Sequence, residues 1–85
     1  MKEFSCVVTD PIGIHARPAG ELAKKVKEFE SDVTIVKGDK SAKVRSLMKV
    51  MGLGVRQGDE ITVQVEGPDE EACAAAVETF IRENL

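Results

Sequence analysis

The stretch DEITVQVEG, residues 59–67, decides how the chain folds. Its apolar residues Ile61, Val63 and Val65 recur at every second position, so they face one way along an extended segment. This period predicts a strand with one buried face. A strand of this kind needs partner strands beside it and a layer over its apolar face, and the rest of the sequence must provide both.

Two other stretches predict the partner strands. Residues 3–8, EFSCVV, place Phe4, Cys6 and Val8 on one face of a strand. The segment DVTIVKGDKSAKVR, residues 32–45, predicts a hairpin in which Gly38-Asp39 forms the turn and residues 40–44 return. Four strands therefore form one sheet, antiparallel or mostly so.

Three stretches predict helices that cover this sheet. The first runs from Ala16 and has an apolar stripe of Ala19, Leu22, Ala23, Val26 and Phe29. The second is short, with Ser46 as its N-cap and Gly52 and Gly54 at its end. The third follows Gly67-Pro68-Asp69 and has an inner stripe of Ala72, Cys73, Ala76, Val77, Phe80 and Ile81. The order β-α-β-β-α-β-α predicts an α+β fold whose helices share one face of the sheet.

The composition fits one small domain with an aliphatic core. The chain has 85 residues, 42% of them hydrophobic, with three Phe and neither Trp nor Tyr. It contains no signal-peptide pattern and no apolar run of the roughly 20 residues that span a bilayer, so a cytoplasmic protein without membrane association is expected. Cys6 and Cys73 form no CxxC pair, and we expect two buried free thiols, no metal site and no cofactor.

Charge is distributed unevenly along the sequence. The net charge is −3, but residues 1–56 carry eleven bases and seven acids, whereas residues 57–85 carry one base and eight acids. A basic half favours an acidic partner surface or a nucleic acid. Because few aromatic side chains are available to stack on bases, we expect no nucleic-acid partner.

The motif GIHARPAG, residues 13–20, holds the only histidine. With His15 at the N-cap of the first helix, Pro18 falls in the first turn, where its missing N–H costs little. The free backbone N–H groups of Ala16 and Arg17 and the guanidinium of Arg17 then surround an oxyanion site beside the imidazole. Imidazole attacks phosphorus only when neutral, and nearby positive groups favour its neutral form. The motif therefore predicts a phosphoryl-accepting histidine.

Other interpretations of His15 remain open from the residues alone. A single histidine near a helix start is often only a capping or surface residue, which would make the chain a small binding module. A hydrolase or general-base enzyme is a second alternative, but no serine, cysteine or second histidine lies nearby in sequence to complete a hydrolytic pair. This favours a carrier over an enzyme.

GIHARPAG together with RSLMKVMGLGV, residues 45–55, resembles HPr, the histidine-containing phosphocarrier family of the bacterial sugar phosphotransferase system. The resemblance covers the whole chain and implies a single domain over residues 1–85. It implies an open-faced β-sandwich, with a four-stranded antiparallel sheet covered on one face by three helices. It also implies that His15 accepts a phosphoryl group on Nδ1 from Enzyme I, which phosphoenolpyruvate charges, and passes it to the IIA component of a sugar permease. Arg17 matches the family's phosphate-binding arginine, and Pro18 matches the proline that follows it. The resemblance also implies a monomeric carrier that is not an enzyme.

The resemblance extends to Ser46. In many Gram-positive members the matching serine is phosphorylated by HPr kinase/phosphorylase, and the product helps a catabolite repressor bind DNA. Met48, Val50 and Met51 resemble that type, but Lys49 and Gly52 stand where it usually has glycine and serine. Regulation at Ser46 and service in a paralogous regulatory or nitrogen-related branch therefore remain open.

The second helix also predicts a docking surface. It is too short to bury every face, so some of Leu47, Met48 and Met51 should be exposed, although a core role is the alternative. Flexible methionine suits a surface that meets several partners. Four cations are expected to ring the patch and attract acidic partners: Lys24, Lys27, Arg45 and Lys49.

Overall fold

A computed structural model describes residues 1–13 and 16–84. Its elements, in chain order, are β1 (Lys2–Val7), α1 (Ala16–Val26), β2 (Asp32–Lys37), β3 (Lys40–Lys43), α2 (Leu47–Gly52), β4 (Glu60–Glu66) and α3 (Glu70–Asn84). The predicted order of elements is confirmed, and the predicted boundaries differ by only a few residues.

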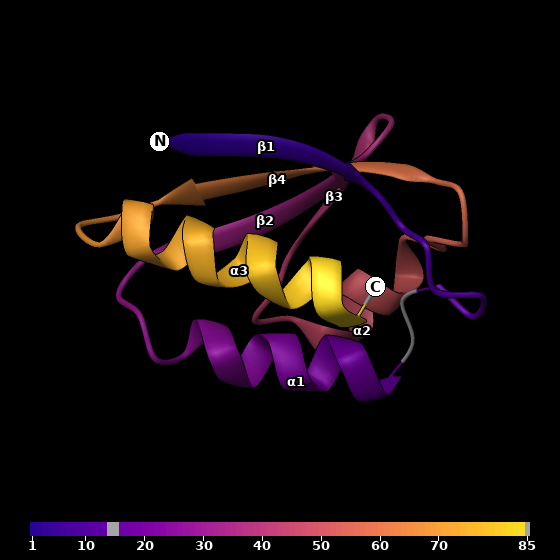
Figure 1. Ribbon diagram of the computed structural model, residues 1–85, viewed down its shortest axis with the longest axis horizontal. Helices are drawn as coiled ribbons and strands as arrows, with labels where there is room; N and C mark the ends of the chain where they lie inside the picture. Colours follow the sequence, from indigo (N-terminus) through magenta and orange to yellow (C-terminus); the bar gives the residue numbers. More distant parts are fainter. Residues whose placement is uncertain (14–15, 85) are drawn as a thin grey trace.

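The sheet is antiparallel throughout, with the strand order β1-β4-β2-β3 (Figure 1). β4 lies between β1 and β2, and its Val63 pairs with Phe4 on one side and Ile35 on the other. The side chains of Ile61, Val63 and Val65 have no exposed surface. The alternation in residues 59–67 therefore corresponds to a strand in the interior of the sheet, with one face completely buried.

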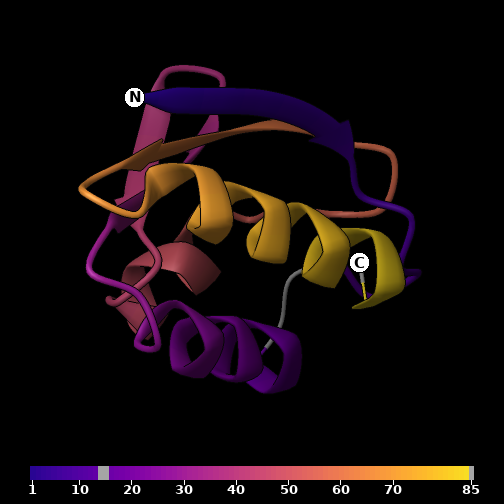
Figure 2. The same ribbon diagram turned by 60° about the vertical axis from the view of Figure 1, so that its left-hand side comes forward.

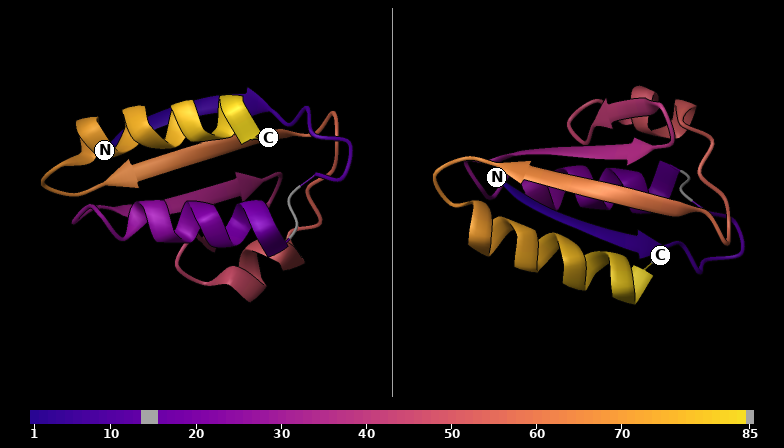
Figure 3. Two further views of the ribbon diagram at one scale, coloured as in Figure 1. Left: turned by 60° about the horizontal axis from the view of Figure 1, so that its bottom comes forward. Right: turned by 90° about the horizontal axis from the view of Figure 1, so that it is seen from above.

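The three helices lie on one face of this sheet, as Figures 2 and 3 show. The core between the layers is aliphatic, with Leu22, Val26 and Val77 almost completely buried. Each such side chain stabilises the fold by about 1.5–3 kcal/mol relative to its exposed state. The predicted α+β architecture, an open-faced β-sandwich, is confirmed.

The opposite face of the sheet is polar. Ser5 and Thr62 join their hydroxyls at 3.1 Å, and Gln64 Nε2 donates to Glu3 Oε2 at 2.9 Å. Such cross-strand contacts suit a face that carries no covering layer.

One predicted core position is wrong. Ala72 is exposed, whereas Cys73, Val77 and Ile81 are buried. One residue advances the helix by about 100°, so Ala72 lies at the edge of the stripe that the other three define.

Hydrogen bonds from residues 30 and 31 to Asp69 fix the start of α3. Ser31 is completely buried, and its hydroxyl donates to Asp69 Oδ1, while the Glu30 amide donates to Asp69 Oδ2 at 2.9 Å. A side chain at Gly67 would lie 2.5 Å from Cα of Ser31, so the two segments approach as closely as glycine allows. The Ser31 hydrogen bond, followed by the Glu30 amide, lowers the pKa of Asp69.

Candidate functional site

The loop before α1 is held by its own turn and by the segment after α2. Asp10 Oδ1 accepts the Ile12 amide at 2.8 Å, and the Gly13 amide donates to the Asp10 carbonyl at 2.9 Å. Gly13 has φ of 79°, and a Cβ there would overlap the Val55 carbonyl oxygen. The chain therefore enters the His15 motif from a tightly constrained position. His15 itself lies outside the described residues.

The first turn of α1 separates its two predicted phosphate-site residues. Pro18 is buried, whereas the Arg17 side chain is 84% exposed. Pro18 is the third residue of the helix, where no intrahelical N–H bond is lost. The backbone of Ala16 begins the helix, as predicted. Pro18 thus anchors the turn, while the guanidinium of Arg17 remains accessible to a ligand from solvent.

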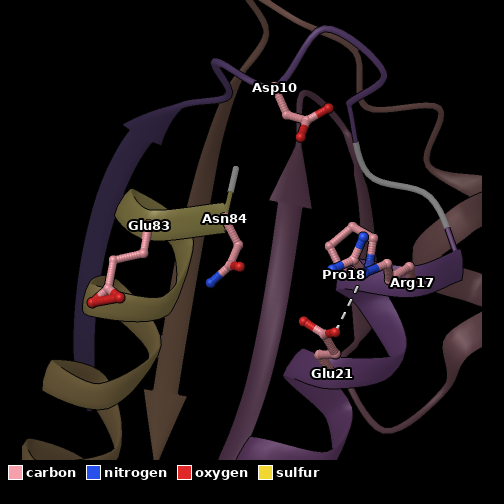
Figure 4. Close-up of a pocket in the computed structure, with 6 residues that line it drawn as sticks. All are labelled: Asp10, Arg17, Pro18, Glu21, Glu83 and Asn84. Atoms are coloured by element: carbon pink, nitrogen blue, oxygen red, sulfur yellow. Dashed lines mark ion pairs between the residues drawn. The ribbon is translucent and has the colours of Figure 1, made fainter.

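A hollow of about 240 Å³ lies between the start of α1 and the end of α3. It is lined by Asp10, Arg17, Pro18, Glu21, Glu83 and Asn84 (Figure 4). Arg17 Nε lies 3.6 Å from Glu21 Oε1, four residues later on the same helix. Among the described lining residues Arg17 is the one cation, whereas Asp10, Glu21 and Glu83 contribute three carboxylates. The positive charge predicted at this site is therefore partly offset by acids.

Sequence reasoning missed the acids of this hollow. The spacing between Arg17 and Glu21 is a readable signal, because residues four apart share a helix face. No sequence pattern connects Glu83 or Asn84 to Arg17, since their place in the same hollow depends on how α3 crosses the sheet.

Ser46 occupies the predicted N-cap position of α2 but does not act as predicted. Its carbonyl accepts the Val50 amide at 3.0 Å, while its side chain makes no capping hydrogen bond. With φ of −103° and ψ of 85°, its backbone leaves the hydroxyl unused by the helix. The side chain is half-buried beside α2.

The predicted docking residues differ in exposure. Met48 is 78% exposed and Met51 37%, whereas Leu47 is half-buried and packs against the core. The cations Lys24, Lys27 and Lys49 are exposed, and Arg45 Nε lies 3.8 Å from Asp32 Oδ1. Sequence reasoning missed Ile12, which is 69% exposed on the loop that packs against residues 55–56.

The two cysteines are free thiols in positions of low reactivity. Cys73 is buried and Cys6 half-buried. Desolvation raises the pKa of both thiols, so the reactive thiolate is disfavoured at neutral pH. In the described part of the chain, no helix combines the length and apolar character needed to cross a bilayer.

A family model described as the HPr component phosphorylation site of the phosphotransferase system (PTS) matches residues 2–83. The chain belongs to the HPr family. It is 42% identical over 82 residues to the phosphocarrier protein HPr of Mycoplasma capricolum, covering 95% of this chain and 92% of that relative. HPr family members serve as phosphocarriers and are generally not catalysts, so this chain is a phosphocarrier of the phosphotransferase system, with sugar transport as the process it serves.

Solved HPr structures share the fold closely. A mycoplasma histidine-containing phosphocarrier protein superposes with a TM-score of 0.91 at 36% identity, covering 96% of this chain and 93% of that one. The HPr of Thermoanaerobacter tengcongensis gives 0.91 at 34% identity, covering 98% and 93%. The HPr-like fold expected from the two motifs is therefore confirmed.

Proposed function

We propose that His15 carries the phosphoryl group, which it accepts from Enzyme I and passes to the IIA component of a sugar permease. The observation that carries this proposal is the exposed guanidinium of Arg17 on the first turn of α1, two residues after His15. A group in this position can hold phosphoryl oxygens by charge-assisted hydrogen bonds. The backbone amides of Ala16 and Arg17 belong to the first turn and have no intrahelical acceptors, so they add donors.

The transfer step needs a neutral imidazole and a stabilised phosphoryl group. The Nδ1 lone pair of His15 forms a bond to phosphorus, and the bond from phosphorus to the donor breaks, with its electron pair leaving on the donor. The positive field of Arg17 and of the helix end favours the neutral ring before transfer and stabilises the phosphoryl oxygens after it. The reverse sequence delivers the group to the acceptor, so the carrier needs neither cofactor nor metal.

The exposed face of α2 is the proposed docking surface for Enzyme I and the IIA component. Its exposed methionines supply adaptable apolar contact, and half-buried Leu47 lies beside them. Lys24, Lys27, Arg45 and Lys49 would attract acidic partner surfaces and speed transient encounter. Ile12, exposed on the loop before α1, would add a further apolar contact for these partners.

Regulation at Ser46 is part of the same proposal. Its hydroxyl is not engaged in capping, so modification by a kinase would remove no helix hydrogen bond. A phosphate there adds about −1.5 to −2 charges close to Arg45 and Lys49 and would weaken the attraction for acidic partners. The product would also be able to present a new surface to a catabolite repressor. We further propose that the chain acts as one domain and as a monomer in the cytoplasm.

The deciding experiment incubates the protein with phosphoenolpyruvate and Enzyme I. We expect acid-labile phosphate on the wild type and none on His15→Ala, which should remain folded because loss of an N-cap costs only about 0.5–2 kcal/mol. Circular dichroism of the variant supplies the folding control. A His15→Ala variant that still carries acid-labile phosphate would refute the assignment of His15 as the phosphoryl acceptor. An unlabelled wild type would favour a binding module, and turnover of a substrate would favour an enzyme.

A further inference from the structure

A second hollow, of about 410 Å³, lies where the outer edge of the sheet meets α2. Its lining combines two lysines, three hydroxyl side chains and one small apolar residue, which come from β2, β3, α2 and the N-cap of α2: Thr34, Ser41, Ala42, Lys43, Ser46 and Lys49. Thr34 pairs with Lys43 across the β2-β3 ladder, so the two side chains share one face of the sheet. Strands and helix thus bring together residues that are up to fifteen positions apart.

The polar groups of this hollow are unused within the described residues. Lys43 and Lys49 form no ion pair there, whereas Lys37, for example, lies 3.0 Å from Asp59. The hydroxyls of Thr34, Ser41 and Ser46 likewise make no hydrogen bond among the described residues. None of the described residues that line the hollow is a carboxylate, although the sequence has fifteen acids and twelve bases.

We propose that this hollow binds a phosphate monoester, with Lys43 and Lys49 neutralising its charge and the hydroxyls donating hydrogen bonds to its oxygens. Two cations match the charge of about −1.5 to −2 that a phosphate monoester carries at neutral pH. Two sources can supply this chemistry: a phosphate esterified to Ser46, which itself lines the hollow, or the phosphate of a free metabolite. The first source rests on the regulation proposed above, and the second does not.

The site also changes how modification of Ser46 would act. A phosphate held by Lys43 and Lys49 withdraws Lys49 from the docking surface as well as adding negative charge. Aspartate carries one charge on a shorter side chain, so it would engage the two lysines less completely. Ser46→Asp should therefore reproduce only part of the effect of phosphoserine.

The first arm of the test measures the ionisation of phosphoserine installed at position 46 during synthesis. A ³¹P NMR titration should give a second phosphate pKa below the ordinary value of about 6. Each cation in contact with the dianion should lower this pKa by about 0.7 unit even at the dielectric constant of water. Lys43→Gln should raise that pKa, and the double variant with Lys49→Gln should raise it further. Lys40→Gln removes a lysine of the same strand that does not line the hollow and is the matched control.

The second arm titrates the unmodified protein with glycerol 3-phosphate, with glycerol and sodium chloride as controls. Saturable shifts of the Lys43 and Ser46 amide signals that disappear in the double variant would identify a free phosphate monoester as a ligand. A response in either arm supports the site and names its source. Equal phosphate pKa values in wild type and double variant, together with no saturable shift, would overturn it. Absence of Ser46 phosphorylation in cells would instead refute only the proposed regulation.

Discussion

Gly13→Ala tests whether the loop before α1 positions His15. Two effects add at this residue. A left-handed conformation costs a residue with a Cβ about 1–2 kcal/mol, and φ at Gly13 is 79°. The new Cβ would also overlap the Val55 carbonyl oxygen and lie 2.8 Å from Cα of Arg56, and overpacking of this kind costs a further 1–3 kcal/mol or so. The total loss in the free energy of unfolding is about 2–5 kcal/mol.

Gly38→Ala is the matched control. Gly38 has φ of 61°, but a Cβ there meets nothing within 4 Å, so only the conformational cost of about 1–2 kcal/mol applies. Urea unfolding followed by circular dichroism measures both losses. Equal losses would refute the claim that contact with residues 55–56 holds the loop.

The functional half of this prediction uses the transfer rate from Enzyme I under conditions where both variants are folded. Displacement of the loop moves His15, which follows two residues later, and an error of 1 Å in a reacting group can slow a step about 100-fold. We expect Gly13→Ala to transfer at least about tenfold more slowly than Gly38→Ala. A destabilised variant with an unchanged rate would show that the constrained loop serves stability alone.

Further predictions concern the site and the hydrogen bonds to Asp69. Arg17→Ala should slow phosphotransfer about 10- to 100-fold through the loss of a charge-assisted contact, and unchanged rates in both directions would make it only a solvated charge. Glu21→Ala should slow transfer about twofold because it removes the ion pair that orients Arg17, and it should have no effect when Arg17 is already alanine. Glu78→Ala, which removes the matched ion pair with Arg82 on α3, should leave transfer unchanged in either background. Asp69 has a lowered pKa, first because of Ser31, so its stabilisation is present above its unfolded value near 4 and is lost as the pH falls below it. Ser31→Ala should therefore flatten the acid side of the stability profile in urea titrations, and an unchanged slope would contradict this cause. Ser46→Asp should slow association with Enzyme I at low salt and lose that effect as salt is added, while equal rates at low salt would place residue 46 outside the docking face.

The sheet was predictable from sequence because its determinants are local. Alternation marked β4, and Gly38-Asp39 marked the β2-β3 turn, which the structure places between Lys37 and Lys40. The cap at Ser46 was only half predictable. Residue type indicates that a hydroxyl can cap, but the backbone angles before the helix decide whether it reaches a free amide.

The candidate site likewise has features that could be predicted from the sequence and features that depend on tertiary packing. The exposure of Arg17 and the burial of Pro18 follow from their places in the first turn of a helix whose inner stripe is legible in the sequence. Glu83 and Asn84 reach the hollow because α3 crosses the sheet beside α1, and this packing is set by the whole core rather than by a motif. The lysines of the second hollow were visible as charges, but their lack of partners among the residues that the structure describes was not.

The acids around Arg17 suit a phosphate site that must release the phosphoryl group after binding it. If Arg17 holds the phosphoryl oxygens as proposed, the dianion lies at a hollow with one cation and three carboxylates among its described lining residues. Arg17 attracts the phosphoryl oxygens, whereas the carboxylates of Asp10 and Glu83 oppose them. Glu21 acts through Arg17, in an exposed ion pair worth at most about 1 kcal/mol. A site with several convergent cations would bind the phosphoryl group more firmly and slow its release. Because transfer must run forward from one partner and onward to the next, a weak, partly opposed phosphate site keeps both steps accessible.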